Sequence, residues 1–270
     1  MTNPATQTPQ SVPAIRGRIV WHELMTTDPA AAQTFYKKVV GWGTQAWENN
    51  TDYTMWMAGE KPIGGVMTLP EQAAQAGAPP HWLTYIEVPD TDATVAQATG
   101  LGATVIVPAQ SVPTVGRFAV LQDPQGAVFA LMAFEASYGE ETDPALMEFS
   151  WHELVTTDWK AGEAFYQALF GWEKKSEFDM GPMGTYNIFG RDRFMYGGMY
   201  NKPAEMPAPP HWLPYARVES ADAAAERAKE AGGTVLHGPM EVPGGDRIAV
   251  LMDPQGAAFA VHSKAQPVTE

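Results

Sequence analysis

Hydrophobic and polar positions alternate along several short segments of the chain, and this pattern predicts strands joined by single helices. In residues 19–25 the odd-numbered side chains fall on one face of an extended chain and the even-numbered ones on the other. A helix is expected next, because Thr27-Asp28-Pro29 supplies an N-cap and a proline that suits the first turn. Three further strand patterns follow Gly41, the glycine that ends this helix. Residues 19–69 therefore predict a βαβββ module.

A second module of the same order is predicted between Trp82 and Phe134. It follows a connector over residues 72–80 that is rich in Ala, Gly and Pro. The turn before its last strand is Asp123-Pro124-Gln125-Gly126, whose proline and glycine positions suit a type I turn.

The whole arrangement occurs twice along the chain. The stretch from Trp21 to Trp42 aligns without a gap on the stretch from Trp151 to Trp172, and 12 of the 22 positions are identical at an offset of 130. A repeat of this length matches a domain rather than a solenoid unit, so the sequence predicts two tandem domains. The predicted segments are a disordered arm over residues 1–16, a first domain over 17–134, a linker over 135–146, a second domain over 147–264 and a tail over 265–270.

Composition excludes several classes of function. The formal net charge is -14, so the phosphates of a nucleic acid would be repelled. The chain has no cysteine, which rules out disulfides, thiolate metal ligands and a cysteine nucleophile. It also lacks an apolar run long enough for a membrane helix, and its N-terminal residues lack the apolar core of a signal peptide. We therefore expect a cytoplasmic protein without nucleic-acid or membrane partners.

Four marks recur in the same order in both repeats. They are a strand that ends in Thr-Thr-Asp, a Phe-Tyr pair seven residues after the Asp, a Gly-Trp pair and an Asp-Pro-Gln-Gly turn. With these marks the chain resembles the vicinal oxygen chelate superfamily, which includes glyoxalase I, bleomycin-resistance and fosfomycin-resistance proteins and extradiol dioxygenases. The doubled form is similar to its tandem glyoxalase-like, or hydroxylase-like, subgroup. The resemblance implies an α+β fold in which each domain consists of two βαβββ modules that form an open barrel, with helices outside.

The resemblance also implies where a metal would be held. Metal-dependent members carry His or Glu ligands at inward strand positions, and three of these positions can be placed in each repeat. They are occupied here by Trp21, Leu83 and Ala130 in the first repeat and by Trp151, Leu213 and Ala260 in the second. None of these side chains can ligate a divalent cation, so no metal cofactor is expected at the positions that the family uses.

A shifted register leaves a different metal site open in the second repeat. Glu153, His211 and His262 would then share one face, and two histidines with one carboxylate suit Fe, Mn or Zn. The competing interpretation is that the glutamates only form hydrogen bonds, to neighbouring strands or to nearby histidines. His22 and His152 are expected on the helix side of their strands, where a histidine is more often structural than a ligand.

The side chains expected to point into each barrel are mostly aromatic, with one carboxylate. Such a set suits a flat or apolar ligand that has a few polar groups. The alternative is that these side chains only fill the barrel. The candidate ligand-binding residues are Trp21, Glu23, Tyr53, His81 and Tyr85 in the first repeat and Trp151, Glu153, Tyr186, His211 and Tyr215 in the second.

Two functions from different classes remain. The first is a binding protein that holds a small organic molecule in one or both barrels without a metal, as a monomer whose two domains pair with each other. The alternative is a metal-dependent lyase, isomerase or dioxygenase that acts on a vicinal-oxygen substrate. The metal content of the purified protein would discriminate between them.

Overall fold

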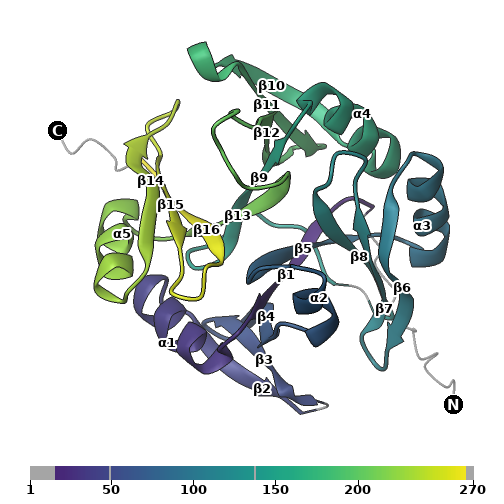
Figure 1. The fold of residues 1–270 in the computed structure, drawn as a ribbon, viewed down its shortest axis with the longest axis horizontal. Coiled ribbons are helices and arrows are strands. Elements are labelled where there is room, and N and C mark those ends of the chain that lie inside the picture. The colour runs from purple at the N-terminus through teal and green to yellow at the C-terminus, as the bar shows by residue number, and fades with distance from the viewer. Residues whose placement is uncertain (1–15, 49, 137, 266–270) are drawn as a thin grey trace, which may run out of the picture.

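Each repeat forms one eight-stranded sheet in the computed structural model, which describes residues 16–48, 50–136 and 138–265 (Figure 1). The strands of the first sheet are β1 (Ile19–Thr26), β2 (Gly43–Trp47), β3 (Asn50–Ala58), β4 (Lys61–Thr68), β5 (His81–Glu87), β6 (Thr104–Val112), β7 (Gly116–Gln122) and β8 (Val128–Phe134). The strands of the second sheet are β9 (Phe149–Thr156), β10 (Glu173–Asp179), β11 (Thr185–Arg191), β12 (Phe194–Asn201), β13 (His211–Arg217), β14 (Thr234–Glu241), β15 (Arg247–Met252) and β16 (Ala258–Ser263). Apart from Arg16 and Ala265, the expected arm and tail lie outside the described residues.

The strand order confirms two βαβββ modules in each repeat. In the first sheet it is β2-β3-β4-β1-β5-β8-β7-β6, and the second sheet repeats it as β10-β11-β12-β9-β13-β16-β15-β14. The two modules of a sheet join through their first strands, which pair antiparallel, β1 with β5 and β9 with β13. Each sheet begins and ends on an edge strand and does not close on itself. The prediction of an α+β fold with two tandem, open domains is thus confirmed.

Four helices of ten to twelve residues lie at the periphery of the molecule (Figure 1). They are α1 (Pro29–Val39), α3 (Thr91–Gly100), α4 (Trp159–Phe170) and α5 (Ala221–Glu230). Each begins after an Asp or Ser whose side-chain oxygen accepts a hydrogen bond from a backbone N–H of the first turn. A short helix, α2 (Glu71–Gln75), lies within the segment predicted as a connector, and a 3₁₀ turn covers Gly181–Met183. Within the described ranges, no helix has the length and apolar composition of a membrane span.

The two sheets do not have separate hydrophobic cores on their helix sides. One buried cluster contains Tyr36 of α1 together with Ala224 of α5, and the other contains Ala98 of α3 together with Tyr166 of α4. In Figure 1, α1 accordingly lies beside α5, and α3 lies beside α4. The first module of each repeat therefore packs against the second module of the other repeat.

A hydroxyl–carboxylate hydrogen bond joins the repeats at each shared core. The Oη of Tyr166 donates to Oδ2 of Asp123 across 3.0 Å, and the Oη of Tyr36 donates to Oδ2 of Asp253 across 3.2 Å. Each aspartate begins an Asp-Pro-Gln-Gly turn, and its Oδ1 accepts backbone N–H groups of that turn. Two of the sequence marks, the Phe-Tyr pair and the Asp-Pro-Gln-Gly turn, therefore meet across the repeats.

Two buried tryptophans form a second pair of reciprocal bonds. The Nε1 of Trp42 donates to the carbonyl of Met147, and the Nε1 of Trp172 donates to the carbonyl of Gly17, each across 2.7 Å. Both carbonyls lie just before the first strand of the opposite repeat. A buried indole N–H without an acceptor costs free energy, so each repeat satisfies a polar group of the other.

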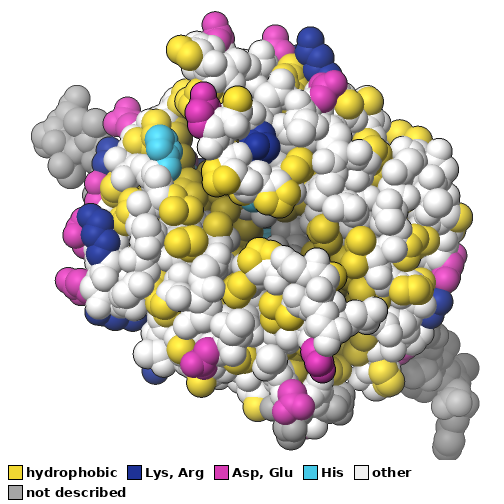
Figure 2. All heavy atoms as spheres, viewed as in Figure 1, with side chains coloured by type: hydrophobic (Ala, Val, Ile, Leu, Met, Phe, Trp, Pro, Cys, Tyr) yellow, Lys and Arg dark blue, Asp and Glu magenta, His cyan; other side chains and the backbone are white. Residues whose placement is uncertain are grey.

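Charged side chains contribute less to this contact. Figure 2 shows hydrophobic side chains around a hollow at the centre of the face, with Lys, Arg, Asp and Glu mainly toward the periphery. Among the residues that the structure describes, two ion pairs cross between the repeats, Lys61 with Glu148 at 2.8 Å and Lys38 with Glu230 at 3.4 Å. Lys38 and Glu230 are exposed, and such a pair typically contributes about 0–1 kcal/mol. The apolar cores and the buried hydrogen bonds therefore dominate.

His22 and His152 meet on the helix side of their strands, as expected, and they bond to each other. Their Nε2 atoms are 2.7 Å apart, and Nδ1 of His152 is 2.9 Å from the carbonyl oxygen of Tyr196. A carbonyl can only accept, so Nδ1 of His152 donates, its Nε2 is the acceptor and His22 is the donor in the pair. Burial lowers the pKa of His152 to about 4 and holds the pKa of His22 well below its ordinary range.

We predict that Tyr36→Phe and Tyr166→Phe each lower the free energy of unfolding by about 1–3 kcal/mol, because each leaves a buried carboxylate oxygen without its donor. Urea unfolding monitored by tryptophan fluorescence measures the loss. In a double-mutant cycle, Asp253→Asn should cost less in the Tyr36→Phe background than in the wild type. Both repeats should unfold in one transition, and two separate transitions would contradict the shared cores.

We also predict that the histidine pair makes stability fall as the pH falls. The imidazole of His152 binds a proton near pH 6.5 when unfolded but only near pH 4 when folded, so the unfolded state binds more protons between these values. Between pH 7.5 and pH 5 this difference removes about 2 kcal/mol of stability. His152→Gln should lose correspondingly less stability over the same range, while the contributions of the carboxyl groups are common to both proteins. Parallel pH profiles for the two proteins would refute this role.

Candidate functional site

The inner face of the first sheet carries a connected set of four polar or amphipathic side chains. The Oη of Tyr85, on β5, donates to Oε2 of Glu23, on β1, across 2.8 Å. The hydroxyl of Tyr53, on β3, is a second hydrogen-bond partner of Glu23. The Nε1 of Trp21 in turn donates to the Oη of Tyr53 across 2.9 Å. We call this set, Trp21, Tyr53, Glu23 and Tyr85, the first floor.

The second sheet repeats the arrangement at the equivalent positions. The Nε1 of Trp151 donates to the Oη of Tyr186 across 2.7 Å, and the Oη of Tyr186 donates to Oε1 of Glu153 across 2.8 Å. Tyr215 is the other hydrogen-bond partner of Glu153. This set, Trp151, Tyr186, Glu153 and Tyr215, is the second floor. Eight of the ten residues singled out from the sequence therefore lie in the two floors.

A glycine in the neighbouring strand makes room for one tyrosine of each floor. Gly65 lies beside Glu23 in the parallel pair of β1 and β4, and Gly198 lies beside Glu153 in the pair of β9 and β12. A Cβ at Gly65 would overlap with the ring and hydroxyl of Tyr53, and a Cβ at Gly198 would overlap with Tyr186. The tyrosine can therefore lie flat over the strand and reach the carboxylate only because these positions are glycine.

Both carboxyl groups are removed from solvent. Glu23 has 6% of its surface exposed and Glu153 has 9%. Burial raises the pKa of each carboxyl, while the hydrogen bonds from the two tyrosines act in the opposite direction. A carboxylate has about four lone-pair sites, so two tyrosine donors leave acceptor capacity for a ligand. Each floor can therefore accept a hydrogen bond from a molecule on the inner face.

The three candidate histidines form hydrogen bonds outside the floors. The Nδ1 of His81 bonds to the carbonyl of Pro79 at 2.7 Å, and the Nδ1 of His211 bonds to that of Pro209 at 2.8 Å. His262 bonds through Nδ1 to the hydroxyl of Ser150 and through Nε2 to Asp246. The side chains of Glu153, His211 and His262 therefore each bond to different residues, and they do not form one group of metal ligands.

The residues present do not fit the metal that the fold family implies. Leu83 lies opposite Glu23 and Ala130 lies beside Tyr85, so these family ligand positions adjoin the floor but offer no donor atom. Among the residues that the structure describes, no three His, Cys, Asp or Glu side chains are grouped so that they could hold a metal ion.

A pocket of about 440 Å³ opens between the two ends of the first sheet. Its lining comes from β2 and β3 on one side and from the β6–β7 hairpin on the other, and consists of Trp47, Asn50, Gln110, Ser111, Val112, Pro113, Thr114 and Phe118. The ring of Trp47 lies 5.7 Å from that of Tyr53, and the ring of Phe118 lies 6.3 Å from that of Tyr85. The aromatic walls of the pocket therefore contact both tyrosines of the first floor.

The sequence pattern predicted the residues of the floors but not the role of the glycines or the pocket. The glycine pairs Gly64-Gly65 and Gly197-Gly198, each inside a strand pattern, were a visible signal, because a glycine within a strand often marks a close approach by another group. The pocket had no such signal, because its lining comes from segments that are far apart in the sequence.

Comparison with known proteins finds relatives over nearly the whole chain. The Glyoxalase-like domain family matches residues 20–132, and the Glyoxalase/Bleomycin resistance protein/Dioxygenase superfamily matches residues 148–261. A Mycobacterium tuberculosis protein named "Putative glyoxylase CFP32" is 34% identical over 252 residues, which cover 91% of this chain and 94% of that protein. The Streptomyces peucetius protein named "Anthracycline biosynthesis protein DnrV" is 30% identical over 258 residues, which cover 91% of this chain and 92% of that protein.

Solved structures of similar fold include two enzymes. The Mn(II)-bound glyoxalase from Novosphingobium aromaticivorans has a TM-score of 0.63 at 15% identity, over 94% of this chain and 84% of that chain. The 2,3-dioxygenase LapB from Pseudomonas sp. KL28 has a TM-score of 0.65 at 14% identity, over 95% of this chain and 97% of that chain. At such identities the likeness shows the fold alone.

We predict that Gly65→Ala lowers the free energy of unfolding by about 1–3 kcal/mol, because the added methyl group forces Tyr53 away from Glu23. Gly43→Ala is the matched control, since a Cβ there would lie 3.6 Å from its nearest neighbour, the Cβ of Met57. In a Tyr53→Ala background the cost of Gly65→Ala should shrink, and thermal unfolding measures the wild type, the three single variants and the double variant. An equal cost in both backgrounds would show that the glycine does not serve Tyr53.

Proposed function

We propose that this chain, which belongs to the Glyoxalase/Bleomycin resistance protein/Dioxygenase superfamily, binds a small organic molecule on the inner face of at least one sheet, without a divalent metal. The duplicated floor carries the proposal. A buried carboxyl is costly for stability unless it is well paired. In both sheets the carboxyl of a glutamate is surrounded by the same side chains, one Trp and two Tyr. An apolar side chain at the position of Glu23 would serve a purely structural role at lower cost.

The chemistry of the floor supports binding rather than metal catalysis. It offers an indole face, two tyrosine rings and one hydrogen-bond acceptor, which suit a planar molecule that carries a donor. The pocket beside the first floor gives such a molecule a place of about 440 Å³, within the range of about 300–1,000 Å³ that is usual for small-molecule sites. We expect one chain to suffice as a monomer, because its two repeats complete each other's cores.

The alternative is a metal-dependent lyase, isomerase or dioxygenase, and the name of one relative, "Putative glyoxylase CFP32", favours it. In this chain such an enzyme would need Fe, Mn or Zn at residues other than the family's ligand positions. The candidate set in the sequence is Glu153, His211 and His262.

Metal analysis separates the two functions. Protein purified without chelators should contain far less than one Fe, Mn or Zn per chain, and His211→Ala should leave that content unchanged. A stoichiometric metal that disappears in His211→Ala or Glu153→Gln would replace the binding function with the enzymatic one.

We predict that Glu23→Gln weakens ligand binding about 10- to 100-fold, because a hydrogen bond to a charged acceptor contributes about 1.5–3 kcal/mol. Calorimetric titration with a panel of aromatic compounds, comprising phenols, aryl amines and aryl carboxylates, measures the effect. The variant should fold, since it removes a buried charge while keeping the shape of the side chain. Glu153→Gln reports in the same way on the second floor. Absence of saturable binding by every member of the panel would count against the proposed function.

A further inference from the structure

We infer that the first sheet is the one that binds the ligand, and that its pocket selects an uncharged planar molecule with hydroxyl groups, such as a phenol. This inference rests on the proposed function and adds the class of ligand, the sheet that binds it and a residue, Thr114, that determines specificity. It is carried by the difference between two hairpins that stand over nearly identical floors.

The β6–β7 hairpin of the first repeat and the β14–β15 hairpin of the second align at the offset of 130. Four of the six hairpin residues that line the first pocket are replaced in the second repeat by side chains of different chemistry, while Val112 and Pro113 are retained. Gln110 corresponds to Met240, Ser111 to Glu241, Thr114 to Gly244 and Phe118 to Ile248. The first hairpin therefore presents an amide, hydroxyls and an aromatic ring where the second presents aliphatic side chains, a carboxylate and a glycine.

Thr114 adopts a backbone conformation that threonine rarely takes. It is the third residue of the turn Val112–Val115, which is closed by a 3.0 Å bond from the N–H of Val115 to the carbonyl of Val112. Its φ is +67°, and Gly244, at the same place in the second hairpin, has φ of +103°. A turn with proline second and a positive φ third normally carries glycine or asparagine there, and a β-branched residue is strained. The strained residue lies on the pocket, where a hydroxyl can contact a ligand.

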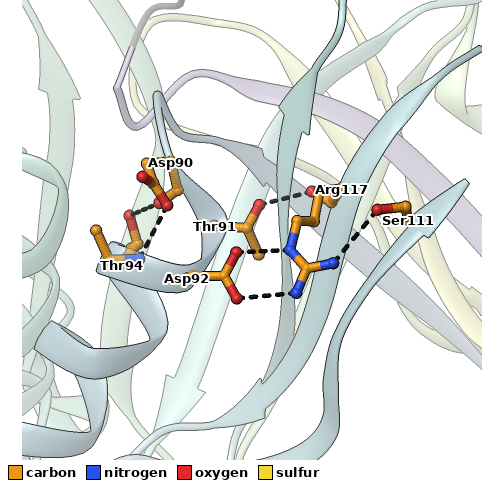
Figure 3. Close-up of polar contacts among 7 residues, drawn as sticks. Asp90, Thr91, Asp92, Thr94, Ser111 and Arg117 are labelled. Carbon is orange, nitrogen blue, oxygen red and sulfur yellow. Dashed lines mark hydrogen bonds and ion pairs between the residues drawn. The ribbon is translucent and has the colours of Figure 1, made fainter.

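The pocket is lined by uncharged side chains, and the arginine of its hairpin is paired with an aspartate. Arg117 forms two bonds to Asp92 at the start of α3, from Nε to Oδ2 at 2.6 Å and from Nη2 to Oδ1 at 2.9 Å (Figure 3). Its Nη1 also reaches the hydroxyl of Ser111 at 3.3 Å, so this hydroxyl points toward Arg117 and α3, although Ser111 borders the pocket. The guanidinium is thus committed to Asp92, so neither an anionic nor a cationic ligand meets a free opposite charge at this hairpin.

The pocket and the first floor together define the ligand. Trp47 and Phe118 form walls that suit a flat ring system, and they contact Tyr53 and Tyr85. Below them, Glu23 has acceptor capacity for a hydroxyl donor. At the rim, the side-chain amides and hydroxyls can bond to further oxygen atoms. A neutral hydroxylated arene satisfies all three regions.

Calorimetric titration with 2-naphthol, 2-naphthoate and naphthalene tests the selection. We expect 2-naphthol to bind with one site per chain, and at least tenfold more tightly than the carboxylate or the hydrocarbon. Gln110→Met, which gives the first hairpin the side chain that the second has at this place, should weaken 2-naphthol at least threefold, because Gln110 lies opposite Phe118 on the pocket. Met240→Gln, the reverse change in the second repeat, should leave binding unchanged. Two sites per chain, a preference for 2-naphthoate, or no effect of Gln110→Met would overturn the inference.

Thr114→Gly tests the strained residue. It should weaken 2-naphthol at least fivefold while the protein melts at the same or a higher temperature, because the glycine relieves the backbone. Thr114→Asn keeps a polar side chain that tolerates positive φ and should retain more affinity than the glycine variant. Equal affinity of Thr114→Gly and the wild type would remove Thr114 from the site. If 2-naphthol fails but aryl amines or aryl carboxylates bind in a Glu23-dependent way, only this inference fails. If the whole panel fails, the proposed function fails with it.

Discussion

The hydroxyl of Tyr36 bonds to the carboxylate of Asp253 in the other repeat, and the hydroxyl of Tyr166 bonds to Asp123 in return. These bonds lie in two apolar clusters, each built from one module of the first repeat and one module of the second. Neither repeat can bury its helix side alone, because the other repeat supplies apolar residues to each cluster and the acceptors for buried donors. The rest of the structure depends on this reciprocal burial, which holds two open sheets in a fixed relation.

Burial of the outer faces between the repeats leaves the inner faces of the sheets available for a ligand. An open sheet with one packed face normally has a polar second face, yet these inner faces carry Trp, Tyr and a buried Glu. The free energy lost in removing Glu23 from water is offset only in part by two tyrosine donors, as its raised pKa indicates. Strong packing on the helix side allows such a carboxyl to persist on the inner side. Stability and the candidate site therefore lie on opposite faces of the same strands.

The sequence predicted the parts of the structure that depend on local pattern. Alternation along residues 19–25 placed Trp21 and Glu23 on one face and His22 on the other, and the internal repeat predicted two open α+β domains, which the strand order and the superfamily match confirm. It did not predict that the first module of each repeat packs against the second module of the other, because a hydrophobic face does not reveal its partner. The bond between His22 and His152 depends on how the repeats pack and could not be predicted either. The Phe-Tyr pair and the Asp-Pro-Gln-Gly turn were read as marks of a family, but their physical role is the contact between repeats.

The same reciprocal burial determines which positions can differ between the two repeats and which cannot. Tyr36, Asp123 and their counterparts are constrained, since a change in one repeat leaves a buried group of the other without its partner. The floors are constrained as well, because Tyr53 depends on the glycine beside it in β4. The ends of the β6–β7 and β14–β15 hairpins, residues 110–118 and 240–248, contribute no residue to either shared cluster, so their side chains can change without loss of a buried partner. Duplication thus gives one chain two equivalent floors. The hairpins are the part of each repeat that can change and so determine which ligand each sheet binds. A threonine held at a positive φ in one hairpin, where the other has glycine, is the kind of difference that stability alone does not explain.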